Sequence, residues 1–143
     1  MIVTVTPNPA IDITLSVDTL DIGEVNRTKD KHRDPAGKGI NVARALSKNG
    51  HATIAVFPAD PVNGSWIIRA LAEAGVESST TPIIGEVRNN ITIIDNAGRT
   101  TKINEPGPVI TPAEISALSE KLEWRLDEHP RWLVAAGSLP VGL

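Results

Sequence analysis

Cysteine is absent from the 143 residues of this sequence. The chain therefore cannot form a disulfide framework, a thiolate zinc site or a thiol nucleophile. Long apolar runs are absent as well, since the longest fall far short of the ~20 residues that a membrane span requires. The N-terminus leads directly into a strand-like segment without the pattern of a signal peptide. These absences predict a cytoplasmic protein that has no membrane-spanning segment.

The sequence also lacks an excess of positively charged residues. The 14 lysines and arginines are outnumbered by 17 aspartates and glutamates, and no run of basic residues forms a local patch. We therefore expect no nucleic-acid partner. The remaining composition, 41% hydrophobic and 22% charged, is typical of a soluble globular protein. The length suits one domain with a substantial core.

The stretch 35–46 is a small-residue turn that leads into a predicted helix at about 40–49. Gly37 and Gly39 flank Lys38, and because they lack Cβ atoms they let the backbone approach a ligand closely. The start of the helix directs its positive dipole end to the same place, which favours a phosphate or a hydroxyl-rich group. A glycine-rich turn that only caps the helix is the alternative.

Two common phosphate-binding motifs do not match this turn. A Walker A loop requires glycine where His32 stands and serine or threonine where Gly39 stands. A dinucleotide-binding fingerprint requires a third glycine where Val42 stands. The turn therefore belongs to neither class.

Hydrophobic periodicity predicts strands that alternate with helices. Apolar runs indicate buried strands at 1–6, 52–57 and 131–136, and helices are predicted at 40–49, at 63–74 and from Thr111 until Pro130. Two β-rich insertions interrupt this order: strand-like pieces at 15–33 suggest a small antiparallel flap, and 90–95 with 100–104 suggest a hairpin. The order βαβαβ predicts an α/β layer fold with parallel strands.

Two polar residues follow predicted strands. Asp12 comes after the turn that ends the first strand, and Ser138 lies in the turn after the last one. Ligands bind at the carboxyl ends of strands in α/β sheets, so Asp12, the Gly37 turn and Ser138 are predicted to converge on one ligand. A turn aspartate that bonds only local backbone remains the alternative for Asp12.

Five segments resemble the phosphofructokinase B branch of the ribokinase-like sugar kinases, and within it the group of 1-phosphofructokinases and tagatose-6-phosphate kinases. In chain order they are Thr6-Pro7-Asn8-Pro9-Ala10-Ile11-Asp12, Gly23-Glu24-Val25-Asn26-Arg27, Gly37-Lys38-Gly39-Ile40-Asn41-Val42-Ala43-Arg44, Val87-Arg88-Asn89-Asn90 and Gly137-Ser138-Leu139-Pro140. The resemblance implies an αβα core with a small β-sheet lid. Residues 1–143 would then be the N-terminal part of a single carbohydrate kinase domain, with lid segments at approximately 15–33 and 88–104.

The resemblance also implies roles for individual residues. The residue matching Asp12 bonds sugar hydroxyls, and the turn matching Gly37, Lys38 and Asn41 lies against the sugar phosphate. The residues matching Arg88 and Ser138 bind the phosphate of the substrate, with Asn90 close by and Arg27 as a further lid contact. Ala36 replaces a glycine found in many members, which is a mild departure. From the residues alone, an arginine in a flap such as Arg27 usually faces water.

The family's catalytic motifs lie beyond this stretch, because its members are about twice as long. The resemblance places in their second half an Asn-x-x-Glu segment involved with magnesium and a Gly-x-Gly-Asp turn whose aspartate is the general base. Neither motif occurs in residues 1–143. We therefore expect no catalytic residue and no metal ligand here, an isolated chain that is inactive, and ATP and Mg2+ bound mainly by the other half.

The implied function is ATP-dependent phosphorylation of a ketohexose monophosphate, namely fructose 1-phosphate to fructose 1,6-bisphosphate. Tagatose 6-phosphate and fructose 6-phosphate remain alternative substrates, because their sites share these groups. A non-catalytic module that binds sugar phosphates is the alternative from another class. A homodimer formed through the lid is the implied partner.

Overall fold

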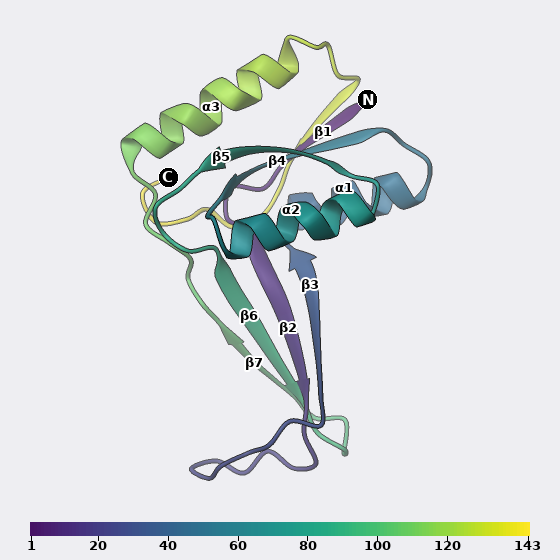
Figure 1. Ribbon diagram of the computed structural model, residues 1–143, viewed down its shortest axis with the longest axis vertical. Helices are drawn as coiled ribbons and strands as arrows, with labels where there is room; N and C mark the ends of the chain where they lie inside the picture. Colours follow the sequence, from purple (N-terminus) through teal and green to yellow (C-terminus); the bar gives the residue numbers. More distant parts are fainter.

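The computed structural model describes residues 1–143 and contains two four-stranded sheets and three helices (Figure 1). The core sheet has the order β5-β4-β1-β8 and is parallel throughout; it comprises β1 (Ile2–Val5), β4 (Thr53–Ala59), β5 (Glu77–Pro82) and β8 (Trp132–Ala135). The lid sheet has the order β3-β2-β6-β7; it comprises β2 (Ala10–Ser16), β3 (Asp30–Ala36), β6 (Arg88–Ile94) and β7 (Thr100–Asn104). The helices are α1 (Lys38–Lys48), α2 (Asn63–Glu73) and α3 (Pro112–Leu126).

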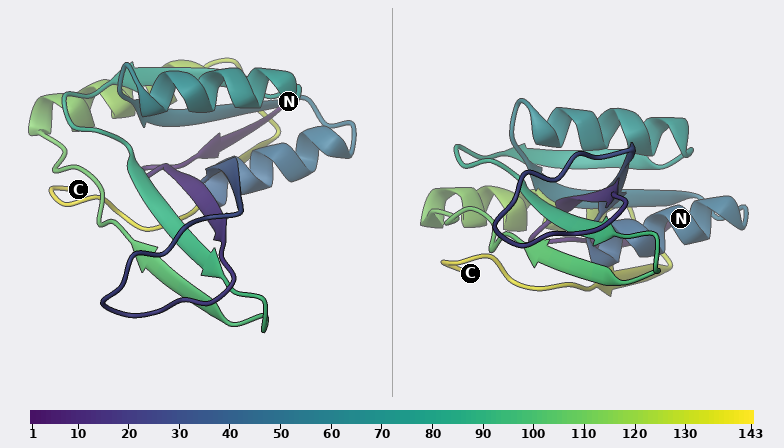
Figure 2. Two further views of the ribbon diagram at one scale, coloured as in Figure 1. Left: turned by 60° about the horizontal axis from the view of Figure 1, so that its bottom comes forward. Right: turned by 90° about the horizontal axis from the view of Figure 1, so that it is seen from below.

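Helices cover both faces of the core sheet because successive residues of its strands point to opposite sides. Phe57 of β4 lies in a buried cluster with Ile40 of α1 and Ile67 of α2. Its neighbour Val56 lies in a second buried cluster with Leu118 of α3. The result is an αβα arrangement, with α1 and α2 on one face and α3 on the other (Figures 1 and 2). None of these helices combines the length and the apolar character needed to span a membrane.

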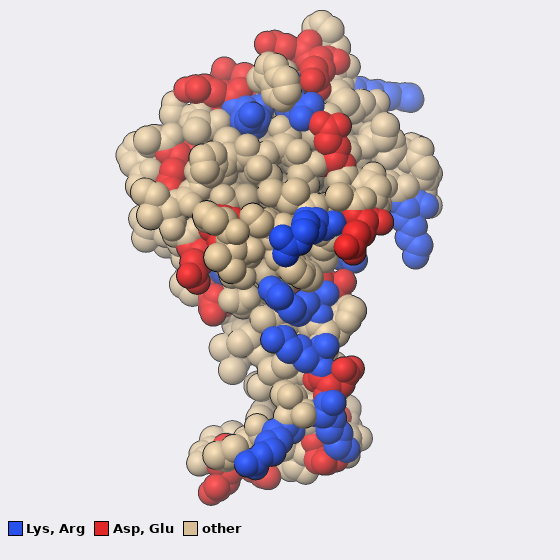
Figure 3. Space-filling model, viewed as in Figure 1, with Lys and Arg blue, Asp and Glu red and all other residues tan.

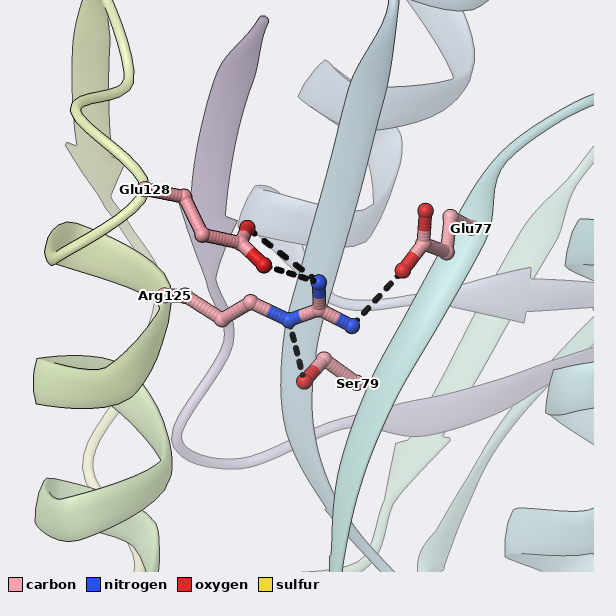
Figure 4. A network of polar contacts seen from close by, with 4 residues as sticks. All are labelled: Glu77, Ser79, Arg125 and Glu128. Carbon is pink, nitrogen blue, oxygen red and sulfur yellow. Dashed lines mark hydrogen bonds and ion pairs between the residues drawn. The ribbon is translucent and has the colours of Figure 1, made fainter.

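The end of α3 is fastened to β5 by one arginine (Figure 4). The Arg125 guanidinium donates to Ser79 Oγ at 2.9 Å, to Glu77 Oε1 at 2.6 Å and to Glu128 Oε1 at 3.2 Å. It also lies 4.4 Å from the centroid of the Trp124 ring. This contact fixes α3 at the outer strand of the core sheet, where fewer apolar partners are available.

The lid sheet extends away from the core sheet and its helices (Figure 1). Strand β2 pairs parallel with β6 and antiparallel with β3, and β6 and β7 form a hairpin. Asp12 pairs with Asn90 on one face, whereas Ile13 pairs with Ile91 on the other. The lid sheet therefore has a polar face and an apolar face, as strand alternation requires.

The first insertion differs from the sequence prediction in its strand positions. The strand-like pieces expected at 15–33 are two strands at 10–16 and 30–36, and residues 17–29 lie outside any strand. Strand β3 is an edge strand whose outer half is exposed, so its charged residues could not reveal it through apolar alternation. Basic side chains follow one another along this part of the surface, with acidic ones beside them (Figure 3).

The prediction of a buried strand at 131–136 was wrong about burial. Strand β8 exists and pairs with β1, but Trp132 is 63% exposed and Leu133 41% exposed. The reason is its position at the edge of the core sheet, with a neighbouring strand on one side only. Apolar composition identifies a strand, whereas burial depends on what packs against it.

Candidate functional site

The start of α1 is pressed against the end of β1. Gly37, with φ +118°, separates β3 from α1, and a Cβ atom there would lie 2.5 Å from Thr6 Cγ2. A Cβ atom on Gly39 would lie 2.4 Å from the Val5 carbonyl oxygen. Both glycines are therefore required by the close approach of the helix to the strand. The helix begins at Lys38, two residues earlier than the periodicity predicted.

The positive end of α1 is not neutralised within the chain. No side chain caps this helix, its first turn contains no acidic residue, and no ion pair involves Lys38. Unpaired N–H groups and the helix dipole at such an end favour an anion. The α1 start and the Lys38 ammonium together create a positive region at the junction of core and lid.

Arg88, the first residue of β6, contacts three distant segments of the chain and its strand neighbour Asn90. Its Nη1 donates to Asn90 Oδ1 at 3.3 Å and to the Glu105 carbonyl at 3.2 Å, and its Nη2 donates to Ser138 Oγ at 3.4 Å and to the Asn8 carbonyl at 3.5 Å. The buried Nε has no acceptor, and no carboxylate forms an ion pair with the guanidinium. The four Nη contacts are long, at 3.2 to 3.5 Å, so an anion could replace some of them and bind the guanidinium in the bidentate manner typical of arginine.

Asp12 and Asn90 form a polar pair on adjacent strands of the lid sheet. Asn90 Nδ2 donates to Asp12 Oδ1 at 2.9 Å, and the two residues are register partners on β2 and β6. Asp12 therefore lies within a strand, which removes the alternative of a turn aspartate that bonds only local backbone. The remaining acceptor positions of its carboxylate suit the hydroxyl groups of a sugar.

These groups line one cavity of about 360 Å³. Its lining comprises Asn8, Asp12, Ala36, Gly37, Lys38, Asn41, Arg88, Asn90, Gly137 and Ser138. All seven residues predicted to bind substrate are among them: Asp12, Gly37, Lys38, Asn41, Arg88, Asn90 and Ser138. They come from the lid sheet, from the start of α1 and from the turn that follows β8 of the core sheet. The structure does not bring Arg27 to this cavity, because that residue is exposed in the 17–29 loop.

Asn8 lines the cavity and was missed by sequence reasoning. Asn8 is only 4% exposed. Its Nδ2 donates to the Pro106 carbonyl at 3.1 Å and to Ser138 Oγ at 3.4 Å, whereas its Oδ1 has no hydrogen-bond partner. The available signal was its position between Pro7 and Pro9 directly after a predicted strand, because ligands bind at the carboxyl ends of strands in α/β sheets. Asn8 therefore holds Ser138 beside Arg88.

A larger hollow of about 720 Å³ adjoins the cavity and shares Asp12 and Asn41 with it. Its charged residues include Asp34 and Arg44, which pair with each other at 3.2 Å. The smaller cavity is the better candidate, because its Lys38 and Arg88 cations lack carboxylate partners and converge with the helix start.

The chain matches a family model described as pfkB family carbohydrate kinase over residues 6–142. It is 34% identical over 142 residues to the 1-phosphofructokinase of Vibrio cholerae. It is 39% identical over 145 residues to the ATP-dependent 6-phosphofructokinase isozyme 2 of Mycobacterium tuberculosis. Each alignment covers 99% of this chain but only 44% and 42% of the respective relative. The chain thus spans less than half the length of these relatives.

A solved structure resembles the whole chain. The crystal structure of phosphofructokinase-2 from Escherichia coli in complex with fructose-6-phosphate matches with a TM-score of 0.90 and 29% sequence identity. The match covers 99% of this chain and 46% of that chain. Core sheet, helices and lid sheet therefore share one arrangement with a sugar-phosphate kinase.

Proposed function

Because the chain belongs to the pfkB family of carbohydrate kinases, we propose that residues 1–143 supply the sugar-phosphate-binding part of an ATP-dependent ketohexose-monophosphate kinase. The fold is ribokinase-like, as the sequence motifs predicted. We assign fructose 1-phosphate as the substrate and fructose 1,6-bisphosphate as the product. Residues 1–143 would be the N-terminal part of a single kinase domain, with the lid sheet closing over its substrate.

One observation carries the proposal: anion-binding and hydroxyl-binding groups converge in the 360 Å³ cavity. Arg88 offers a planar fork of Nη donors whose contacts within the chain are long, at 3.2 to 3.5 Å, and Ser138 Oγ lies beside it. The start of α1 with Lys38 adds positive potential. A phosphate monoester is the anion that matches a guanidinium, a hydroxyl and a helix start together.

The sugar end of the substrate is assigned to the lid sheet. The Asp12 carboxylate accepts protons from hydroxyl groups, and the Asn90 carboxamide, bonded to it at 2.9 Å, fixes its orientation. Asn41 lines the same cavity from the first turns of α1. These residues bind and orient the sugar phosphate, which is a large part of catalysis in phosphoryl transfer.

ATP and a divalent metal follow from the kinase family, and the residues of this chain do not fit them. No group of three or more histidine, cysteine, aspartate or glutamate side chains could hold a metal ion. The turn after β8, at 137–142, contains no aspartate. We therefore propose that the nucleotide and the metal bind outside residues 1–143 and that the general base is a residue outside this range. When bound, the metal would neutralise charge on the transferred phosphoryl group.

Fructose 6-phosphate is a second candidate substrate. The Mycobacterium tuberculosis relative is named a 6-phosphofructokinase, and the Escherichia coli structure contains fructose-6-phosphate. The same cation and hydroxyl groups suit both sugars. The choice between them rests on which end of the sugar the phosphate occupies, so direct comparison of the two substrates decides it.

A homodimer through the lid is the proposed assembly. Ile91 and Ile93 of β6 lie on the apolar face of the lid sheet, beside Ile103 of β7, which is 55% exposed. A second lid packed against this face would bury these side chains. Sedimentation of the natively expressed protein at several concentrations tests the assembly.

The test of function uses the natively expressed protein with Mg-ATP and, separately, fructose 1-phosphate, fructose 6-phosphate and tagatose 6-phosphate. Its intact mass is measured first, because a chain longer than 143 residues is expected of a working kinase. Arg88→Ala should raise the apparent KM for the sugar phosphate by about 10- to 100-fold, since a charge-assisted contact is lost. Arg69→Ala is the control, because Arg69 is an exposed arginine on α2 that forms no ion pair.

Three results would be informative. Binding without turnover favours the non-catalytic module. An unchanged KM in Arg88→Ala refutes the phosphate assignment, and a preference for fructose 6-phosphate corrects the substrate.

A further inference from the structure

Asp60 is a buried carboxylate that the substrate cavity does not include. It lies between β4 and α2 and is 3% exposed. Its Oδ1 accepts the backbone N–H groups of Val62 at 2.8 Å and Asn63 at 2.9 Å, and its Oδ2 accepts those of Gly64 at 3.0 Å and Val87 at 2.9 Å. Three of these donors belong to the start of α2. The fourth comes from a residue 27 positions further along the chain.

The carboxylate is held in its ionised form. Burial raises the pKa of Asp60, but the N–H donors, that of Val87 foremost, outweigh burial and hold the pKa below its ordinary value. A carboxylate that accepts several backbone N–H groups provides strong, charge-assisted bonds. Asp60 is thus a fixed anchor between the start of α2 and the chain at Val87.

The Asn63 side chain also forms a hydrogen bond with the backbone of Val87. Its Nδ2 donates to the Val87 carbonyl at 2.8 Å. Both backbone polar groups of Val87 are therefore bound by side chains of the segment 60–63. Val87 is only 1% exposed, and its side chain is packed in the main core cluster. Packing of the side chain thus adds to the two backbone hydrogen bonds in holding this residue in place.

Val87 directly precedes Arg88, and this is where sheet pairing begins. The ladder between β2 and β6 starts with Ala10 opposite Arg88, so Val87 has no ladder partner. Without the two side chains, the polar groups of Val87 would be unpaired and the start of β6 would be free to fray. The Arg88 guanidinium makes contacts of only 3.2 to 3.5 Å, so it cannot fix that backbone by itself.

We propose that Asp60 and Asn63 are positioning residues that clamp the Val87 peptide and thereby aim Arg88 at the phosphate of the substrate. This inference rests on the proposed function of Arg88. A plain helix cap would account for the bonds from Val62, Asn63 and Gly64. It would not account for the two bonds to Val87, which lie outside the helix.

The experiment compares Asp60→Asn and Asn63→Ala with the natively expressed protein. Asn63→Ala leaves the helix cap intact and removes only the bond to the Val87 carbonyl. Binding of fructose 1-phosphate and of unphosphorylated fructose is titrated for each variant. Because a misplaced Arg88 would lose charge-assisted bonds to the phosphate, both variants should weaken sugar-phosphate binding about 10- to 100-fold while fructose binding changes little.

Asp95→Asn is the matched control. Asp95 is 7% exposed and also accepts backbone N–H groups, from Ala97 and Arg99, but it lies in the turn at the far end of the lid. The Asp95→Asn variant should have a lower free energy of unfolding but should keep its selectivity for the phosphorylated sugar. Equal loss in Asp95→Asn and Asp60→Asn would overturn the proposal, since it would reduce Asp60 to a general stabiliser.

The outcomes separate this inference from the proposed function. Wild-type protein that binds neither fructose 1-phosphate nor fructose 6-phosphate overturns both. Wild-type binding that Asn63→Ala leaves unchanged overturns the clamp alone. If Asp60→Asn does not fold, Asn63→Ala decides the question. Amide exchange adds a structural check, because the Val87 N–H should exchange faster in Asp60→Asn.

Discussion

Gly39→Ala tests how tightly the start of α1 is fitted to the core sheet. The new Cβ atom would lie 2.4 Å from both the Val5 carbonyl oxygen and Thr6 Oγ1. Ordinary contact begins at 3.4 Å, so relief requires a movement of about 1 Å. The Val5 carbonyl cannot move freely, because it accepts the Ala136 N–H at 3.2 Å. The start of α1 must therefore move instead.

Two opposing effects decide the magnitude. Alanine favours a helix over glycine by up to ~1 kcal/mol. Forcing an extra methyl group into a packed site costs about 1 to 3 kcal/mol. Because the clash includes backbone atoms, we take the upper part of that cost, about 2 to 3 kcal/mol, and expect a net loss of about 1 to 2 kcal/mol in the free energy of unfolding. A shift of about 1 Å at the helix start that we propose to bind the phosphate should also weaken sugar-phosphate binding by about 10- to 100-fold, because hydrogen bonds to a charged group would be lost.

The assay combines denaturant unfolding with titration by fructose 1-phosphate. Gly98→Ala is the control: Gly98 has φ +76° in the lid turn, and nothing lies within 4 Å of its Cβ position. The control should lose about 1 to 2 kcal/mol through backbone strain and keep its affinity. A Gly39→Ala protein that keeps full stability and full affinity would refute the tight fit.

Three further predictions concern stability. Phe57→Ala removes a fully buried ring between α1 and α2 and should cost about 3 to 5 kcal/mol in denaturant unfolding; a cost below 1 kcal/mol would contradict the assigned core. Arg125→Ala should cost about 1 to 3 kcal/mol, because loss of the largely buried guanidinium leaves Ser79 Oγ without its partner while the carboxylate partners of Arg125 are substantially exposed, and should leave sugar-phosphate affinity unchanged. Because the folded pKa of Asp60 is depressed, its stabilisation is present above the unfolded value near 3.9 and is lost as pH falls through the lower folded value. Asp60→Asn should therefore weaken the pH dependence of stability below about pH 4, and an unchanged acid profile would argue against an ionised Asp60.

The sequence predicted the helices well, because their signals are local. The capping box before α3 is one example: Glu114 N–H donates to Thr111 Oγ1 at 3.3 Å, and Thr111 N–H donates to Glu114 Oε2 at 2.8 Å. Seven of the ten cavity residues were found from motif resemblance and from strand ends, whereas Asn8 was not. Neither signal depends on knowing how distant segments pack.

The features that the sequence did not reveal depend on packing between distant segments. Strand β3 is defined by its pairing with β2, and its charged residues conceal the apolar alternation of a strand. Strand β8 has the apolar composition of a buried strand but lies at the edge of the core sheet. The Asp60 clamp joins residues 27 positions apart. No local sequence pattern predicts such a contact, because an aspartate directly before a helix is typical of a helix cap and gives no sign of a distant partner.

A crystal structure of the natively expressed protein with fructose 1-phosphate is the most direct test of the site. We expect phosphate oxygens within hydrogen-bond distance of the Arg88 guanidinium and Ser138 Oγ, with sugar hydroxyl groups on Asp12. A phosphate held instead in the larger hollow, beside Arg44 and Lys48, would contradict this expectation.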